Sequence, residues 1–336
     1  MQEKIRLMTE EELEQLCQKR PDSMTYIACL MKRDAERLKQ SSTDICFDGL
    51  NKKTGGINSG LYVIAAAPSL GKTTFALQIA DGFAASGKDV IFFSLEQSRL
   101  EMVSKSFARI AAQRRLDAAD QIDPAAIESS PCSLAIRSDQ LTAEQQKEVS
   151  TAQREYFETI GDRMSIIEVS NYCGVSDIAG YVQRYIDRTG TRPIIFIDYL
   201  QSLQPIDCEH RTDKEKTDEN ITALKRLSRY YNITIFVISA INRSNYTNRI
   251  SHEALKESGG IECIADVIWG LQMFCMNDSI FDSATRINEK REIIAKECVR
   301  NPREVEIVCL KNKYGVSNFK QSFFYFPAND LYVEKL

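Results

Sequence analysis

Five apolar, β-rich segments recur along the chain with helical patterns between them, and this alternation leaves few possible folds. The segments are 61–67, 90–95, 192–198, 233–239 and 265–273. Each is almost continuously apolar, which is typical of parallel strands buried on both faces. Helical spacing is found at about 72–86, 98–113, 143–157, 175–188 and 214–231. The sequence therefore predicts an α/β fold, a mostly parallel twisted sheet with helices on both faces.

The two ends of the chain depart from this alternation. Segments 304–310 and 319–326, joined by a turn at Tyr314 and Gly315, predict a closing antiparallel pair. At the other end, Thr9 and Glu12 form a capping-box pattern for one short helix, and a second helix over 23–40 carries an apolar stripe. That stripe packs either on its own domain or on a neighbouring subunit. We expect a helical appendage over 1–44 and one large domain over 45–336.

Composition limits the function classes. The chain has 43 basic and 47 acidic residues and a net charge of −4, so any nucleic-acid binding must be local. Its ten cysteines contain no Cys-x-x-Cys pair, which favours reduced thiols over a disulfide framework or a zinc site. No apolar run approaches the roughly 20 residues of a membrane span. We expect a cytoplasmic protein without membrane contact.

The first apolar segment runs directly into a loop and then a helix. The loop reads Pro68, Ser69, Leu70, Gly71, Lys72, Thr73 and Thr74. Amides at a helix N-terminus, a lysine and a hydroxyl are the groups that a phosphate chain and its Mg²⁺ require. Ala66 stands where the usual pattern has its first glycine. The flanking strand and helix still predict a nucleotide site, with Lys72 on the phosphates and Thr73 on the metal.

Two further strands end near an acidic residue. Asp198 closes the segment 192–198, and Glu96 follows 90–95. Ligands bind at the carboxyl edge of such sheets, so we expect Asp198 to hold Mg²⁺ through a water. We expect Glu96 to orient or deprotonate the attacking water. The alternatives are a turn-initiating aspartate at 198 and a helix-capping carboxylate at 96, just before Ser98.

Six phrases in a fixed order make the chain resemble the DnaB helicase family over about residues 45–325. They lie at 47–51, 67–73, 93–96, 197–201, 239–243 and 255–266. The resemblance implies a RecA-like P-loop NTPase core in a six-subunit ring, with ATP held between neighbours and single-stranded DNA in the central channel. It also implies a role in DNA replication, with a helicase loader or a primase as partner.

By the same resemblance, two loops face the channel, one within 205–216 and one within 243–260. Their basic residues and glycine amides would grip the DNA backbone without reading its sequence. The expected DNA-binding residues are Arg211, Lys214, Lys216, Arg243, Arg249, Lys256 and Gly259.

Three features of the chain depart from the family pattern, two single residues and the segment 1–44. Lys313 stands where the family has an arginine finger that reaches the neighbour's ATP, and Lys311 matches a second basic residue there. Lysine lacks the planar fork that grips two phosphoryl oxygens. Ala240 replaces a glutamine that reports the γ-phosphate to the DNA loops. Residues 1–44 are expected to be too short for the family's globular N-terminal domain and to correspond to its linker helix.

These observations favour one function and leave others open. The leading hypothesis is an ATP-hydrolysing DNA helicase or translocase motor of the DnaB type. The alternative is a RecA-like ATPase that uses nucleotide as an assembly switch without unwinding DNA, which Ala240 and Lys313 favour. A nucleoside or metabolite kinase is disfavoured because no arginine-rich lid segment is evident.

Overall fold

The computed structural model describes residue 15 and residues 43–119, 123–169, 173–205 and 212–335, with only the backbone given at 256–259. The chain divides into two units, Met1–Thr43 and Asp44–Leu336. Apart from residue 15, which is helical, the predicted appendage helices lie outside the described residues and stay predictions. The second unit contains the sheet and the helices that cover it.

The described strands form one nine-stranded sheet in the order β3-β2-β4-β5-β1-β6-β7-β8-β9. The six strands from β3 to β6 pair in parallel, and the last three pair antiparallel. Their bounds are β1 Gly60–Ala66, β2 Val90–Ser94, β3 Met164–Glu168, β4 Ile194–Asp198, β5 Thr234–Ala240, β6 Val267–Met273, β7 Arg303–Asn312, β8 Lys320–Phe326 and β9 Leu331–Glu334. The predicted fold class is confirmed.

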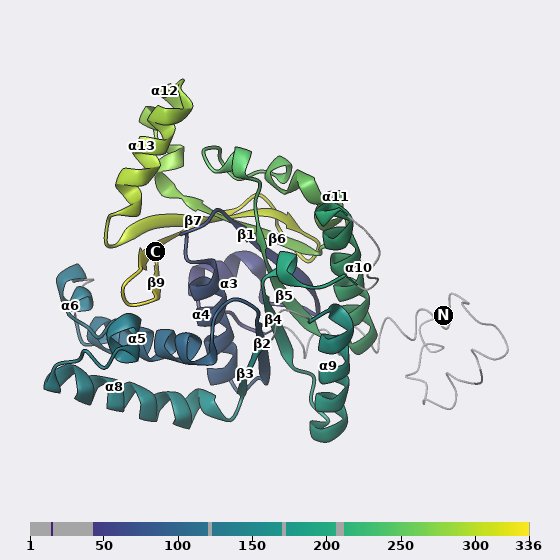
Figure 1. Cartoon of the computed structure of the whole chain (residues 1–336), viewed down its shortest axis with the longest axis horizontal. Coiled ribbons are helices and arrows are strands. Elements are labelled where there is room, and N and C mark those ends of the chain that lie inside the picture. Colours follow the sequence, from purple (N-terminus) through teal and green to yellow (C-terminus); the bar gives the residue numbers. More distant parts are fainter. Residues whose placement is uncertain (1–14, 16–42, 120–122, 170–172, 206–211, 336) are drawn as a thin grey trace, which may run out of the picture. The chain divides into compact units, whose positions relative to one another are not determined.

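Helices cover both faces of the sheet (Figure 1). One face carries α4 (Lys72–Ala85), α5 (Arg99–Asp117) and α8 (Ala143–Tyr156), and the other carries α9 (Val175–Thr189) and α10 (Asp213–Tyr231). The shorter helices are α3 Asp48–Thr54, α6 Pro124–Glu128, α7 Ser133–Arg137, α11 Gly259–Ile264, α12 Ser279–Ser283 and α13 Ile287–Cys298. Figure 1 shows α12 and α13, which connect β6 to β7, projecting from the body.

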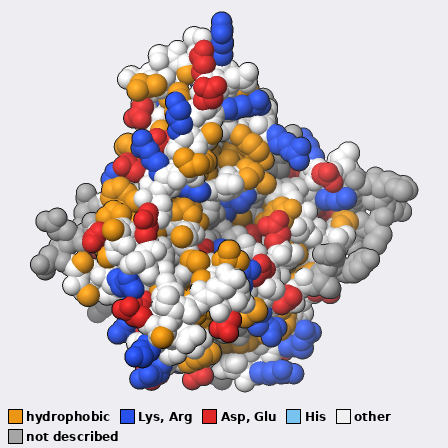
Figure 2. Space-filling view, turned by 60° about the vertical axis from the view of Figure 1, so that its left-hand side comes forward, with side chains coloured by type: hydrophobic (Ala, Val, Ile, Leu, Met, Phe, Trp, Pro, Cys, Tyr) orange, Lys and Arg blue, Asp and Glu red, His pale blue; other side chains and the backbone are white. Residues whose placement is uncertain are grey.

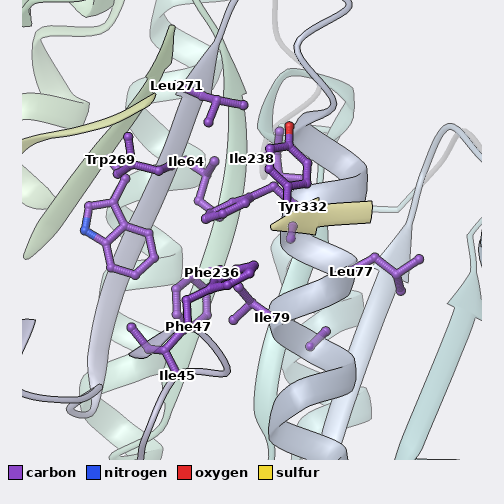
Figure 3. Packing of buried hydrophobic residues seen from close by; sticks show 14 of the residues in the cluster. Ile45, Phe47, Ile64, Leu77, Ile79, Phe236, Ile238, Trp269, Leu271 and Tyr332 are labelled. Atoms are coloured by element: carbon purple, nitrogen blue, oxygen red, sulfur yellow. The ribbon is translucent and has the colours of Figure 1, made fainter. Parts of the chain in front are cut away.

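Strand β1 shows how the sequence builds two apolar layers. Successive side chains of a strand point to opposite faces. Tyr62 and Ile64 therefore enter the layer under α4, whereas Leu61 and Val63 enter the layer under α9 and α10. Figure 3 shows part of the first layer, with Ile64, Phe236 and Trp269 from three neighbouring strands and Ile79 from α4. Burying one such large side chain stabilises the fold by about 1.5–3 kcal/mol, so the two apolar layers stabilise the sheet and fix the positions of its strand ends.

The surface carries both signs of charge. Figure 2 shows Lys, Arg, Asp and Glu side chains interspersed over the face that it presents, including the projecting end of the molecule. Such mixing agrees with the small net charge of −4. Among the described helices, none is long and apolar enough to cross a membrane.

Candidate nucleotide-binding site

The carboxyl ends of β1, β2, β4 and β5 meet at one edge of the sheet. Ser94 pairs with Asp198 across β2 and β4, and Ala66 pairs with Ala240 across β1 and β5. A cavity of about 550 Å³ opens there. Its position is where ligands bind in open α/β sheets, because the connecting loops diverge at that point.

The loop after β1 has a backbone shape that two later strands fix in place. Gly71 precedes α4 with φ 72°, and Ser69 has φ 64°. A Cβ on Gly71 would lie 2.7 Å from Tyr332 Oη, so this position favours glycine on space as well as on φ. Tyr332 donates its hydroxyl to the Leu70 carbonyl at 2.5 Å, and Arg303 Nη1 donates to the Ser69 carbonyl at 3.0 Å.

Most of the predicted loop residues line the cavity, and one does not. The lining residues from the loop are Pro68, Ser69, Gly71, Lys72, Thr73 and Thr74. Leu70 is the exception, because it is 4% exposed and its side chain packs in the layer under α4. An apolar side chain is more stable there than in a polar cavity, so only the Leu70 backbone belongs to the loop's binding surface.

Thr73 and Asp198 form the polar centre of the cavity. Thr73 Oγ1 donates to Asp198 Oδ2 at 2.5 Å, and Asp198 is only 1% exposed. Burial raises the pKa of Asp198 to about 6, and Glu96 adds to the shift while the Thr73 bond and Lys72 oppose it. A buried carboxylate with a neighbouring hydroxyl offers the hard oxygen atoms that Mg²⁺ prefers.

Replacing Asp198 with asparagine is expected to stabilise the nucleotide-free protein near pH 7.5, by about 1–3 kcal/mol. The folded pKa of about 6 lies above the ordinary 3.8, so ionisation destabilises the fold as pH rises through that interval. The gain should be absent below about pH 4 and complete above about pH 7. Urea unfolding near pH 7.5 and below about pH 4 measures the change in the free energy of unfolding. An equal effect of the substitution at the two pH values would contradict the account.

Lys72 and Glu96 also line the cavity. Burial lowers the pKa of Lys72, and the charges of Asp198 and Glu96 oppose that change. The start of α5 is capped by Ser98 and Glu101 in a capping box, so Glu96 is not the helix-capping carboxylate of the alternative interpretation. The Glu96 carboxylate is therefore available to act in the cavity.

Several residues around the cavity were not predicted, and four of them, Lys105, Arg303, Tyr325 and Asp330, come from distant parts of the chain. Lys105, Arg303 and Tyr325 line the cavity, and Lys105 Nζ contacts Asp330 Oδ1 at 2.6 Å. Asp330 in turn accepts from Thr74 Oγ1 at 3.0 Å. These residues lie on α5, on the antiparallel strands and on the turn before β9. No sequence motif marks Arg303, Tyr325 and Asp330, because the pairing of β7, β8 and β9 brings them to the loop.

The predicted DNA-binding residues lie on several different elements. Thr212 caps α10, so Lys214 and Lys216 lie on its first helical turn rather than in a loop. Arg249 makes two bonds to Asp282, at 2.7 and 2.8 Å. Of the rest, Arg243 begins a 3-10 turn, Lys256 lies in the 3-10 segment His252–Ser258, Gly259 is the first residue of α11, and Arg211 lies outside the described residues.

Lys311 and Lys313 lie at the end of the sheet where the parallel strands begin, opposite the cavity. The end of β7 pairs with the start of β6, and the start of β6 is level with the start of β1. Lys311 Nζ donates to the carbonyls of Glu262 and Cys263, at 2.5 and 3.2 Å, and Lys313 Nζ contacts Asp266 Oδ1 at 3.3 Å. Neither lysine contributes to the cavity of its own chain.

Ala240 lies between two cavities. It lines the main cavity and also a smaller one of about 140 Å³ that Lys214 and Thr217 of α10 line. Gln201, which follows β4, donates to Ser239 Oγ at 2.9 Å and accepts from the Ala240 amide at 3.3 Å. The side chain of Gln201, which follows β4, therefore lies beside the end of β5. The family pattern instead has a glutamine at position 240, on β5 itself.

Comparison with known proteins places these observations in a family. The model of the DnaB-like helicase C-terminal domain matches residues 43–321. Replicative DNA helicase DnaB of Pasteurella multocida is 28% identical over 265 residues, 74% of this chain and 49% of that protein. The Geobacillus stearothermophilus protein of the same name is 26% identical over 283 residues, 82% of this chain and 56% of its own. The chain thus spans about half the length of these relatives.

Two solved structures share the fold. One is an ATPase domain solved by itself, with a TM-score of 0.70 and 21% identity, and the match covers 94% of this chain and 99% of that chain. The other is a DnaB-like replicative helicase, solved in a study of its interactions with primase, with a TM-score of 0.69 and 20% identity, and the match covers 96% and 73%. The chain belongs to the DnaB-like helicase C-terminal domain family.

Proposed function

We propose that the chain binds Mg²⁺-ATP in the cavity after β1 and hydrolyses it as the motor of a ring-forming DNA helicase or translocase. The observation that carries the proposal is the 2.5 Å contact between Thr73 Oγ1 and the buried Asp198 Oδ2, in a cavity that Lys72 and Glu96 also line. ATP hydrolysis requires a hydroxyl, an ammonium group and two carboxylates, and all four groups lie in this one cavity.

Each group has a distinct role in this proposal. Lys72 neutralises the β- and γ-phosphates, and the amides of the loop at 68–74 bind their oxygens. Thr73 and Asp198 hold Mg²⁺, with Asp198 acting through a water. The metal supplies charge neutralisation of the transferring phosphoryl group. Glu96 orients the attacking water and accepts its proton. The raised pKa of Asp198 supports a metal role, because a buried carboxylate gains most from a nearby cation.

Arg303 and Tyr325 are our candidates for the nucleotide base. They are cross-strand partners on β7 and β8, and the Arg303 Cζ lies 6.0 Å from the Tyr325 ring centre. The Tyr325 ring stacks on Tyr332 with centres 4.4 Å apart, which fixes its orientation. An aromatic face and a guanidinium plane in one cavity can hold a base by stacking.

The Arg303→Met variant is expected to bind ATP about 5- to 30-fold more weakly, because base stacking on arginine contributes about 1–2 kcal/mol. Inorganic tripolyphosphate has no base, so its affinity should change much less. Competition against a fluorescent nucleotide measures both ligands. An equal loss for the two ligands would show that Arg303 acts only through the Ser69 carbonyl.

The far-edge position of Lys313 supports assembly into a ring. Lys313 lies where the parallel strands begin, at the end of the sheet opposite its own cavity, with Lys311 beside it. From there Lys313 can complete an ATP site only in a second copy of the chain. We place single-stranded DNA in the channel of that ring, against the two loop regions, and name a helicase loader or a primase as a candidate partner. The primase-associated homologue agrees with this choice.

Exchanging Lys313 for arginine is expected to raise ATP turnover at least about tenfold, because a planar guanidinium can bind two phosphoryl oxygens of the transition state. Steady-state phosphate release at matched protein concentration checks it. Unchanged turnover, with ring assembly intact, would place Lys313 outside the active site.

Ala240 favours one alternative, an ATPase that uses nucleotide as an assembly switch. Alanine has no polar group to sense a γ-phosphate, although it lies between the main cavity and the one beside α10. Turnover stimulated by single-stranded DNA together with strand separation would support the motor. Nucleotide-dependent assembly without either property would support the switch.

A further inference from the structure

Asp266, at the junction of α11 and β6, is a buried carboxylate with two lysine partners. Its Oδ2 accepts from the Leu61 amide at 2.8 Å and pairs with Lys225 of α10. Its Oδ1 pairs with Lys313 Nζ at 3.3 Å. Burial alone raises the pKa of Asp266, but the Leu61 amide and Lys225 outweigh it and hold the pKa below its ordinary value. The carboxylate is therefore charged and fully partnered.

The two lysines are not equivalent. The Lys225 side chain is 12% exposed and the Asp266 side chain 5%, whereas Lys313 is 43% exposed and lies on the end of a hairpin. Removing Lys225 would leave a buried charge with one cation at the surface, which is costly. If Lys313 leaves, Asp266 keeps Lys225 and the Leu61 amide. Lys313 is thus the partner that can leave at low cost.

The hairpin end is tied to the same junction at other points. The Lys313 amide donates to the Asp266 carbonyl at 3.0 Å, and Tyr314 Oη donates to the Ser59 carbonyl at 2.6 Å. Lys311 donates to the carbonyls of Glu262 and Cys263 in the last turn of α11, where a cation is favourable. The end of β7 therefore holds α11, the helix that follows the second expected DNA loop.

We infer that Asp266 is a resting site for Lys313, and that the Lys313 side chain leaves it to bind a phosphate of a neighbouring copy's nucleotide. Asp266 and Lys225 are positioning residues in this exchange, since neither touches nucleotide. The inference rests on the proposed function.

Amine labelling of the whole chain, read by mass spectrometry at a concentration where it assembles, tests the transfer. Adding Mg²⁺ and a non-hydrolysable ATP analogue should slow labelling of Lys313 about tenfold, because a charge-assisted bond to phosphate replaces an exposed ion pair. Lys225 should stay slow throughout, and the Lys72→Ala protein should show no change. Bound analogue with unchanged Lys313 labelling would overturn the transfer alone. No analogue binding would reject the nucleotide site as well.

The resting site has its own test in nucleotide-free protein. The double variant Asp266→Asn/Lys225→Met removes both buried charges together, so that neither is left unpaired. Labelling of Lys313 should become about two- to fivefold faster, because the ion pair that lowers its reactivity is gone. Exposed Lys88 serves as the reference amine. An unchanged Lys313 rate in a folded double variant would overturn the assignment of Asp266.

Discussion

The Lys72→Ala protein is expected to bind ATP roughly 100-fold more weakly than the unaltered protein, since it loses a charge-assisted contact to two phosphate groups. Lys72 lines the cavity next to Asp198 and Glu96, and no other lysine of the loop can replace it. Isothermal titration with Mg²⁺-ATP measures the affinity. Thermal unfolding of the nucleotide-free variant should match the unaltered protein within a few degrees.

Lys88 provides the matched control. It is an exposed lysine just beyond the end of α4, the helix that Lys72 begins. The Lys88→Ala protein should bind ATP as the unaltered protein does. Equal affinity in the Lys72→Ala protein would mean that the cavity after β1 is not the ATP site.

The Glu96→Gln protein should bind ATP normally and lose turnover by about 10²- to 10⁴-fold, because glutamine keeps the shape but cannot accept the water's proton. Single-turnover phosphate release, with binding measured on the same sample, separates the two effects. Turnover within threefold of the unaltered protein would contradict the assignment of the base.

Glu168 is a control of matched position. It ends β3, next to β2, and pairs in register with Ser94, but it does not line the cavity. Its Oε2 accepts from the Arg99 amide at 3.1 Å, a bond that glutamine can also make. The Glu168→Gln protein should therefore hydrolyse ATP at the ordinary rate.

Much of the fold and the centre of the site could be predicted from the sequence. Buried parallel strands are almost continuously apolar, and their carboxyl ends meet at one edge, so Lys72, Glu96 and Asp198 had to converge. Strand β3 was missed because it is only half-buried at the sheet edge and therefore lacks the continuous apolar pattern of the equally short β2 and β4. Strand β9 was missed because it has four residues and follows a turn at Asp330.

Other features depend on contacts between distant segments, which no local pattern reports. Arg303 and Tyr325 reach the cavity only through the pairing of β7 with β8. The burial of the Leu70 side chain under α4 is one of these features, and the prediction that Leu70 binds nucleotide rests on its backbone. The contact between Lys313 and Asp266 joins a hairpin to the start of β6, 47 residues away along the chain.

Steady-state ATP turnover as a function of protein concentration, with and without single-stranded DNA, tests the motor most directly, with the Glu96→Gln protein as the background. We expect turnover per chain to rise steeply with concentration and to increase further with DNA, because each site is completed by a neighbour's Lys313. Slow turnover, linear in protein and indifferent to DNA, would contradict the motor and leave the assembly switch as the function of the chain.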